Sequence, residues 1–129
     1  MGPGRRKRIF VSFAVEDMWA RDLLRGQEKL GSCPIEYIDF SVRNTWDSAW
    51  KTQCRGRIRG CDGMIAFVSG YTRAADGARW EMECALSEDL PILGIWTRDT
   101  ESYRPPELAN ERIVRWNWQN IATFIDDLP

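Results

Sequence analysis

The feature that most constrains the fold is an uninterrupted apolar run at residues 64–68, bounded by Asp62-Gly63 and Ser69-Gly70. The run is too short for a buried helix and has no polar position facing water, as is typical of a strand buried on both faces. Such strands belong to parallel sheets that carry helices on both sides. The chain must therefore supply further strands and helices in alternation.

The rest of the chain shows this alternation. Runs rich in β-forming residues predict four further strands, at residues 9–13, 35–38, 91–96 and 113–116. Helical spacing of apolar residues predicts helices over residues 16–30, 46–59, 74–88 and 118–128, while the polar segment 97–111 predicts a long loop. Strict alternation predicts an α/β domain of the flavodoxin-like type, a doubly wound five-stranded parallel sheet of order 2-1-3-4-5 with helices on both faces. A ligand crevice is expected outside the carboxyl ends of the first and third strands.

Length and composition fit one globular domain. The chain has 129 residues, of which 43% are hydrophobic, so a single core can form without disulfide bonds. We expect residues 1–7 to form a basic leader and residues 8–129 to form the domain. The cysteines form no CxxC pair, which argues against a metal site and for reduced thiols. They are Cys33, Cys54, Cys61 and Cys84.

Charge and hydropathy indicate where the chain acts. Eighteen basic and nineteen acidic residues give a net charge of -1, which supplies no field to attract nucleic acid. No apolar run approaches the roughly 20 residues that span a bilayer, and no signal peptide is recognisable. We therefore expect a cytoplasmic protein with neither a nucleic-acid nor a membrane partner.

The absence of histidine excludes several catalytic classes. With His at 0, there is no Ser-His-Asp or Cys-His arrangement and no HExxH zinc helix, so catalysis must use carboxylates, hydroxyls or thiols. The third strand ends in Ser69-Gly70 and the last ends in Arg115-Trp116. A phosphate-accepting receiver domain would need an Asp and a Lys there, so this class is excluded as well.

Five motifs, in order, resemble the TIR-like domains of bacterial antiphage systems of the Thoeris type. The resemblance covers residues 8–96 and lies in residues 8–17, 37–41, 50–51, 61–72 and 78–95. The helix motif of that family has a Glu followed four residues later by Ala, which selects Glu81 with Ala85. Here residues 77–80 are Gly-Ala-Arg-Trp, where the usual motif carries an aromatic residue and Val before the Glu.

The resemblance implies an activity on NAD. Such domains cleave the bond between nicotinamide and ribose, giving ADP-ribose or a cyclic ADP-ribose-type signal; NAD is the substrate, and no metal or other cofactor is implied. The chemistry suits a chain without histidine, because loss of neutral nicotinamide leaves positive charge on the ribose, which a carboxylate stabilises. The resemblance also implies antiphage defence, assembly into homo-oligomers, and a separate effector reached through the nucleotide product.

Glu81 is the catalytic candidate. The helical wheel places it at the edge of the apolar face formed by Ala78, Met82 and Ala85, where it can overhang a crevice. Glu83 at the opposite edge is a rival, and a solvated helix carboxylate is the structural alternative.

Five further residues are candidates for substrate binding, each with a structural alternative. Phe13 would lie against a nicotinamide or adenine ring, or would cover the core. Ser12 and Ser69 would contact ribose or phosphate, or would satisfy local backbone groups. Asp39 and Ser41 open the loop after the second strand, which the resemblance implies closes over the site or contacts a neighbouring subunit, although an Asp there also serves turns.

Two further features of the predicted helices bear on binding. Trp80 falls on the far side of its helix from the apolar face, so it is expected to be exposed and is a candidate subunit contact. Lys51, Arg55 and Arg59 form a basic row that would meet a pyrophosphate or remain a solvated helix face.

Two other function classes remain open from the sequence. A non-catalytic TIR-like module for self-association and signalling would keep the fold and leave NAD untouched. A nucleoside-processing enzyme of the deoxyribosyltransferase type would also use a Glu, on a nucleoside. NAD consumption distinguishes the three.

Overall fold

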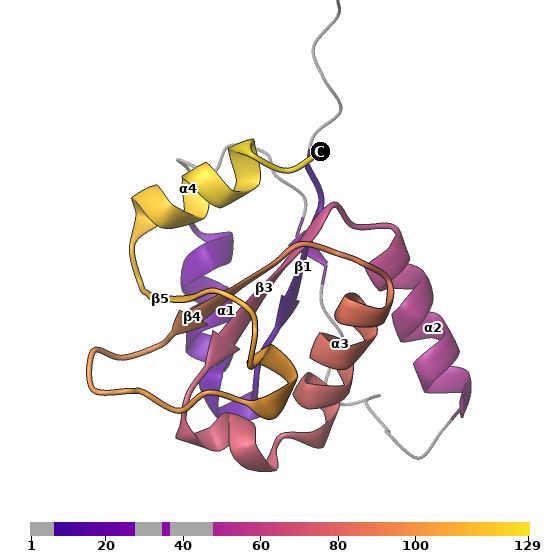
Figure 1. The fold of residues 1–129 in the computed structure, drawn as a ribbon, viewed down its shortest axis with the longest axis horizontal. Helices are drawn as coiled ribbons and strands as arrows, with labels where there is room; N and C mark the ends of the chain where they lie inside the picture. The colour runs from indigo at the N-terminus through magenta and orange to yellow at the C-terminus, as the bar shows by residue number, and fades with distance from the viewer. Residues whose placement is uncertain (1–6, 28–34, 37–47) are drawn as a thin grey trace, which may run out of the picture.

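The computed structural model describes residues 7–27, 35–36 and 48–129, and it shows a parallel sheet at the centre of the molecule (Figure 1). The strands pair in the order β2-β1-β3-β4-β5. Their bounds are β1 (Ile9–Ser12), β2 (Ile35–Glu36), β3 (Gly63–Val68), β4 (Ile92–Trp96) and β5 (Ile113–Arg115). The predicted α/β class with a parallel sheet is confirmed.

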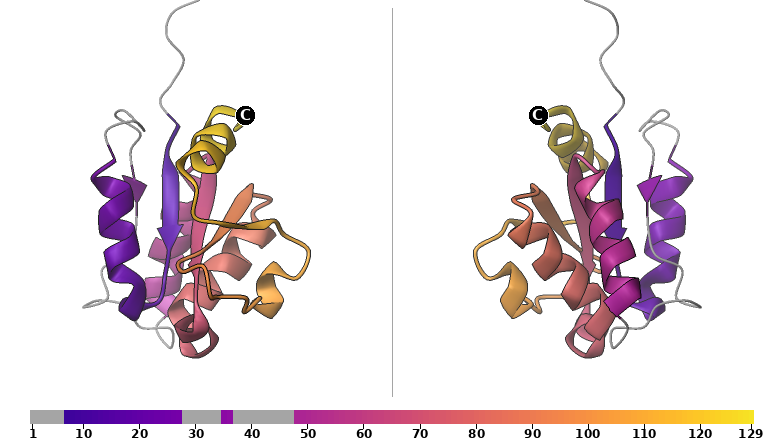
Figure 2. Two further views of the ribbon diagram at one scale, coloured as in Figure 1. Left: turned by 90° about the vertical axis from the view of Figure 1, so that its left-hand side faces the viewer. Right: turned by 90° about the vertical axis from the view of Figure 1, so that its right-hand side faces the viewer.

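Helices cover both faces of the sheet (Figure 2). The α-helices are α1 (Met18–Arg25), α2 (Ser48–Arg59), α3 (Asp76–Ser87) and α4 (Trp118–Asp126), and the 3-10 turns are η1 (Val15–Asp17), η4 (Gly70–Ala74) and η5 (Pro106–Leu108). Because side chains alternate along a strand, Ile9 and Val11 pack under α1 and α4, whereas Phe10 packs under α2 and α3. The two layers form two apolar clusters, one on each side of the sheet.

β3 is the central strand, as its apolar run predicts. All six of its residues are buried, and it pairs with β1 on one side and β4 on the other. The next pairing, between β4 and β5, sets Gly94 opposite Ile113. A Cβ added to Gly94 would lie 2.8 Å from Cγ1 of Ile113, so glycine is needed there for space.

The predicted apolar face of the first helix is only partly confirmed. α1 ends at Arg25, and it buries Ala20 and Leu24. Trp19 and Leu23 are two of the apolar residues whose spacing predicts this helix, yet they are 37% and 55% exposed. Trp19 stacks on Trp116 near the start of α4, with ring centroids 6.1 Å apart.

The predicted start of the third helix is also corrected. Residues 70–74 form the separate turn η4, and α3 begins at Asp76 without a side-chain cap among the described residues. Thr72, which precedes α3, closes a capping box with Ser69 at the start of η4.

The predicted loop 97–111 contains the short turn η5, with Leu108 buried against the α2 and α3 layer. Arg79 of α3 reaches it with a forked ion pair, Nη2 and Nε lying 2.9 and 3.1 Å from Oε2 of Glu107. The loop is therefore packed along α3.

Other expectations concern the leader, the cysteines and the membrane. Lys7 of the predicted leader donates to the main-chain oxygens of Leu128 and Pro129, at 2.9 and 2.8 Å, and residues 1–6 lie outside the described residues. The described cysteines are buried and form no disulfide bond with one another, and Cys33 lies outside the described residues. Within residues 7–27, 35–36 and 48–129, no helix is long and apolar enough to span a bilayer.

We predict that Gly94→Ala lowers the free energy of unfolding by about 1–3 kcal/mol, because its methyl group collides with the Ile113 side chain. Chemical denaturation measures this. In a chain that also carries Ile113→Ala, the added cost of the Gly94 change should largely disappear. An equal cost in both backgrounds would contradict the proposed collision.

Candidate active site

The site centres on the contact between Ser12 and Glu81. Ser12 is the last residue of β1, and Glu81 lies in the middle of α3 with an exposed fraction of 0%. Ser12 Oγ lies 2.9 Å from Oε1 of Glu81 and 3.1 Å from the carbonyl oxygen of Ala78. The hydroxyl has one proton, so it donates to one of these acceptors at a time. Two residues predicted for separate roles are thus brought into direct contact.

The second carboxyl oxygen of Glu81 faces helix α2. Oε2 lies 4.0 Å from Sγ of Cys54, whose thiol is a weak hydrogen-bond donor. The carboxyl group is therefore held between β1 and α2. Glu83, the rival candidate, is exposed on the outer side of α3. The two carboxyl groups therefore differ in exposure: Glu81 is buried, and Glu83 faces water.

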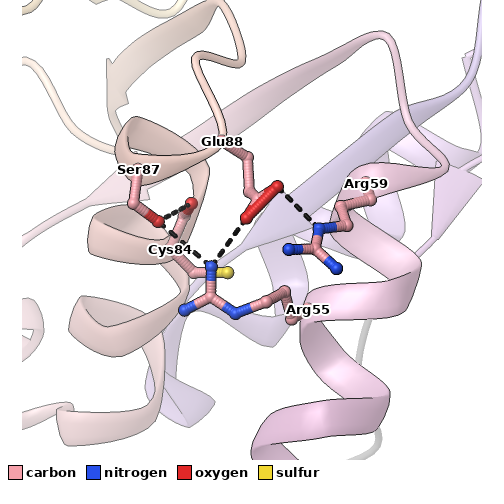
Figure 3. Close-up of polar contacts among 5 residues, drawn as sticks. All are labelled: Arg55, Arg59, Cys84, Ser87 and Glu88. Carbon is pink, nitrogen blue, oxygen red and sulfur yellow. Dashed lines mark hydrogen bonds and ion pairs between the residues drawn. The ribbon is translucent and has the colours of Figure 1, made fainter.

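An ion-pair cluster holds α2 against α3 (Figure 3). Glu88 accepts from Nη1 of Arg55 and from Nε of Arg59, both at 2.7 Å. The hydrogen bond from Arg59, followed by that from Arg55, lowers the pKa of Glu88. Arg55 also donates to Ser87, at 3.2 Å. By joining the two helices, the cluster helps to set the position of Cys54 beside Glu81.

The prediction that Trp80 is exposed is wrong. Its ring is half-buried and packs against Trp50, with ring centroids 5.2 Å apart. Lys51 and Arg55 lie over the same ring, 5.9 and 5.7 Å from its centroid. The basic row therefore covers an aromatic ring and binds Glu88, while the side chain of Arg59 stays 62% exposed.

A second buried carboxyl group lies at the same edge of the sheet. Asp17 is 1% exposed and accepts a hydrogen bond of 2.6 Å from Oγ of Ser69, which follows β3. Burial raises the pKa of Asp17, and the hydrogen bond from Ser69 opposes the rise. Ser69 Oγ also accepts from the backbone N–H of Tyr71, at 3.1 Å. The Ser69 hydroxyl therefore serves local structure, as its alternative reading proposed.

The remaining candidates lie apart from Glu81 or outside the description. Phe13 is buried in the cluster beneath α1 and α4, with the guanidinium of Arg21 5.5 Å from its ring centroid. It therefore packs on the face of the sheet opposite to Glu81 and covers the core. Asp39 and Ser41 lie outside the described residues.

A shallow pocket of about 250 Å³ opens between η1 and the start of α3. Its lining residues are Val15, Glu16, Tyr71, Ala74, Ala75, Asp76 and Gly77. Val15 and Tyr71 are both about half exposed. It lies at the carboxyl edge of β1 and β3, where the topology predicted a crevice.

Sequence analysis missed three residues of this region: Asp17, Trp50 and Cys54. A signal existed for each. Asp17 stands in the first motif of the resemblance, and Trp50 and Cys54 share one face of a predicted helix at a spacing of four.

Solved structures show which class of fold this is. The TIR domain of the Toll-related receptor TRR-2 from Hydra magnipapillata is similar at a TM-score of 0.72 and 15% identity, covering 92% of this chain and 98% of that one. A 2-deoxyribosyltransferase from Bacillus psychrosaccharolyticus is similar at a TM-score of 0.62 and 10% identity, with coverage of 89% and 90%. At these identities the likeness shows the fold alone, an α/β domain of the TIR-like type.

The family follows from the sequence. The family model described as Thoeris protein ThsB, TIR-like domain, matches residues 10–102, and the chain belongs to this family. The predicted resemblance is confirmed. No curated protein sequence matches the chain.

We predict that Asp17→Asn raises the melting temperature at pH 7 by about 2–5 °C. The pKa of Asp17 is raised on folding, so the charged form is disfavoured in the folded state, and the contribution of Asp17 to stability falls as pH rises above its ordinary value of 3.8. Asparagine keeps an acceptor for Ser69 and removes the charge.

Thermal melts of both proteins between pH 4 and pH 7.5 measure this effect. The difference in melting temperature between the two proteins should decrease as the pH falls toward 4. A variant that is less stable at every pH by the same amount would contradict the assigned cause.

Proposed function

We propose that this chain cleaves the nicotinamide–ribose bond of NAD in antiphage defence, releasing ADP-ribose or a cyclic ADP-ribose-type signal, with Glu81 as the catalytic residue. The observation that carries the proposal is a fully buried carboxyl group, bonded to Ser12 at the end of β1, on the helix that bears the Glu motif of this family. A carboxylate that merely kept the helix soluble would face water, as Glu83 does.

The chemistry needs little beyond that carboxylate. The bonding electron pair of the glycosidic C–N bond leaves with nicotinamide, which is neutral on departure, and positive charge develops on the ribose. A carboxylate already fixed in a dry site stabilises that charge without reorganising. Water then adds to the anomeric carbon and loses a proton, or another part of the same molecule adds and closes a ring.

Ser12 serves in this scheme as a positioning residue. Its hydroxyl holds Oε1 of Glu81, so it acts through the carboxylate, whereas the sequence suggested a contact with the substrate. The weak contact of Cys54 with Oε2 restrains the other oxygen.

Burial of Glu81 also bears on regulation. Ribose reaches this carboxyl group only when the surrounding side chains separate, so we expect low basal activity. Contacts between copies of the chain are the natural cause of such a change, and specific activity should then rise with protein concentration. The proposed partners are NAD, further copies of the chain, and a separate effector that binds the nucleotide product, all in the cytoplasm.

Two alternatives make different predictions about substrate. A non-catalytic TIR-like signalling module would associate with itself and leave NAD intact. The likeness in fold to a 2-deoxyribosyltransferase brings in the nucleoside-processing alternative, which would act on deoxynucleosides and spare NAD.

We predict that Glu81→Gln lowers nicotinamide release from NAD by at least about 100-fold, because the variant keeps the shape of the side chain and loses its charge. Glu83→Gln is the matched control, two residues away on the exposed side of the same helix, and it should retain wild-type activity. Release is measured by chromatography at high protein concentration, and the mass of the second product separates ADP-ribose from its cyclic form.

The opposite pattern, loss with Glu83→Gln and full activity with Glu81→Gln, would transfer the role to Glu83. If the wild-type protein releases no nicotinamide at any concentration, the proposed activity is wrong.

A further inference from the structure

The indole N–H of Trp50 is a buried donor with no acceptor among the described residues. Trp50 lies in the first turn of α2, is 5% exposed, and packs in the cluster beneath α2 and α3. Within the part of the chain that the structure describes, Nε1 has no hydrogen-bond partner. Burying an unpaired donor is unfavourable, and buried tryptophans usually find a partner for this group. Contacts among the described residues do not offset the cost of burying this N–H group.

Trp50 lies close to the Glu81 site along helix α2. Cys54, which contacts Glu81, follows Trp50 by four residues on the same face of α2. One helical turn advances about 5.4 Å, so Trp50 lies about that far from Cys54 along the axis of α2, toward the start of the helix. Because α2 returns antiparallel to the strands, its first turn lies toward the carboxyl edge of the sheet, where β1 ends in Ser12 (Figure 1).

Neighbouring contacts hold the indole in place. Its ring packs on Trp80 at 5.2 Å, with an angle of 57° between the ring planes. At the other end of the helix, Arg55 and Arg59 bind Glu88 of the α3 end, which fixes α2 against its neighbour (Figure 3). The donor therefore has a defined position, as a specific contact requires.

We propose that Trp50 is a substrate-binding residue of the Glu81 site, whose indole N–H donates to the carboxamide oxygen of the nicotinamide group. The inference rests on the proposed function. With the ribose at Glu81, that oxygen lies five bonds from the anomeric carbon, a separation of about 5 Å that matches one helical turn. A neutral donor beside aromatic rings suits a carbonyl oxygen, whereas phosphate is bound best by charged donors.

The test compares two substrates in two proteins. The variant Trp50→Phe removes the N–H, and an NAD analogue that carries pyridine in place of nicotinamide removes the acceptor. Trp50→Phe should lower kcat/KM about tenfold on NAD and leave it nearly unchanged on the analogue. The different reactivity of the two leaving groups cancels, because each ratio compares two proteins on one substrate. The control Trp80→Phe makes the same change in the other member of the ring pair and should alter both substrates by one common factor.

A second replacement keeps the test valid if Trp50→Phe does not fold. Incorporation of β-(3-benzothienyl)alanine at position 50 preserves the bicyclic shape and exchanges the N–H for sulfur, and the same substrate-dependent loss is expected. An equal loss on both substrates, or none on either, would overturn the role of Trp50 while Glu81→Gln still tests the proposed function. If the wild-type protein releases no nicotinamide, both proposals fail.

Discussion

Every residue of β3 is buried, and the arrangement of the rest of the molecule follows from that burial. A strand with no side facing water needs neighbours at both edges and a helical layer on both faces, which β1, β4 and the four α-helices provide. Parallel pairing then brings the carboxyl ends of β1 and β3 to one edge. Ser12, Asp17 and Ser69 gather there because of this pairing, although up to 57 positions separate them in the sequence (69 − 12).

Two buried carboxyl groups meet that edge, and each is held by a serine at the end of a strand. Ser12 of β1 holds Glu81, and Ser69 after β3 holds Asp17. Burying a carboxylate is costly, and hydrogen bonds offset part of the cost. The hydrogen bond of Asp17 joins the turn after β1 to the turn after β3, so the role of the Asp17 carboxyl group is structural. For Glu81, which lies opposite a tryptophan donor that has no acceptor among the described residues, we propose that burial serves substrate binding and chemistry.

The fold itself leaves the chemistry open. A receptor TIR domain and a 2-deoxyribosyltransferase share it with this chain at 15% and 10% identity, which shows how widely one scaffold is used. Function must therefore be argued from the site. In this chain, the absence of histidine leaves carboxylates as the main reactive groups, and only one of the two rival carboxylates on α3 is buried.

Local pattern determined the strands and the class of sheet, because apolar spacing directly reflects which residues must leave water, whereas the resemblance to the family selected Glu81. It also placed Trp50, Cys54 and Ile58 on one buried face of α2. Tertiary structure alone decided the partners of these residues: the contact of Ser12 with Glu81 spans 69 positions, and that of Ser69 with Asp17 spans 52. It also turned Trp19 outward and Trp80 partly inward, against the helical wheel. The spacing of residues within one helix shows which face is apolar. How deeply a side chain is buried depends on the size of the residues from other elements that pack against it.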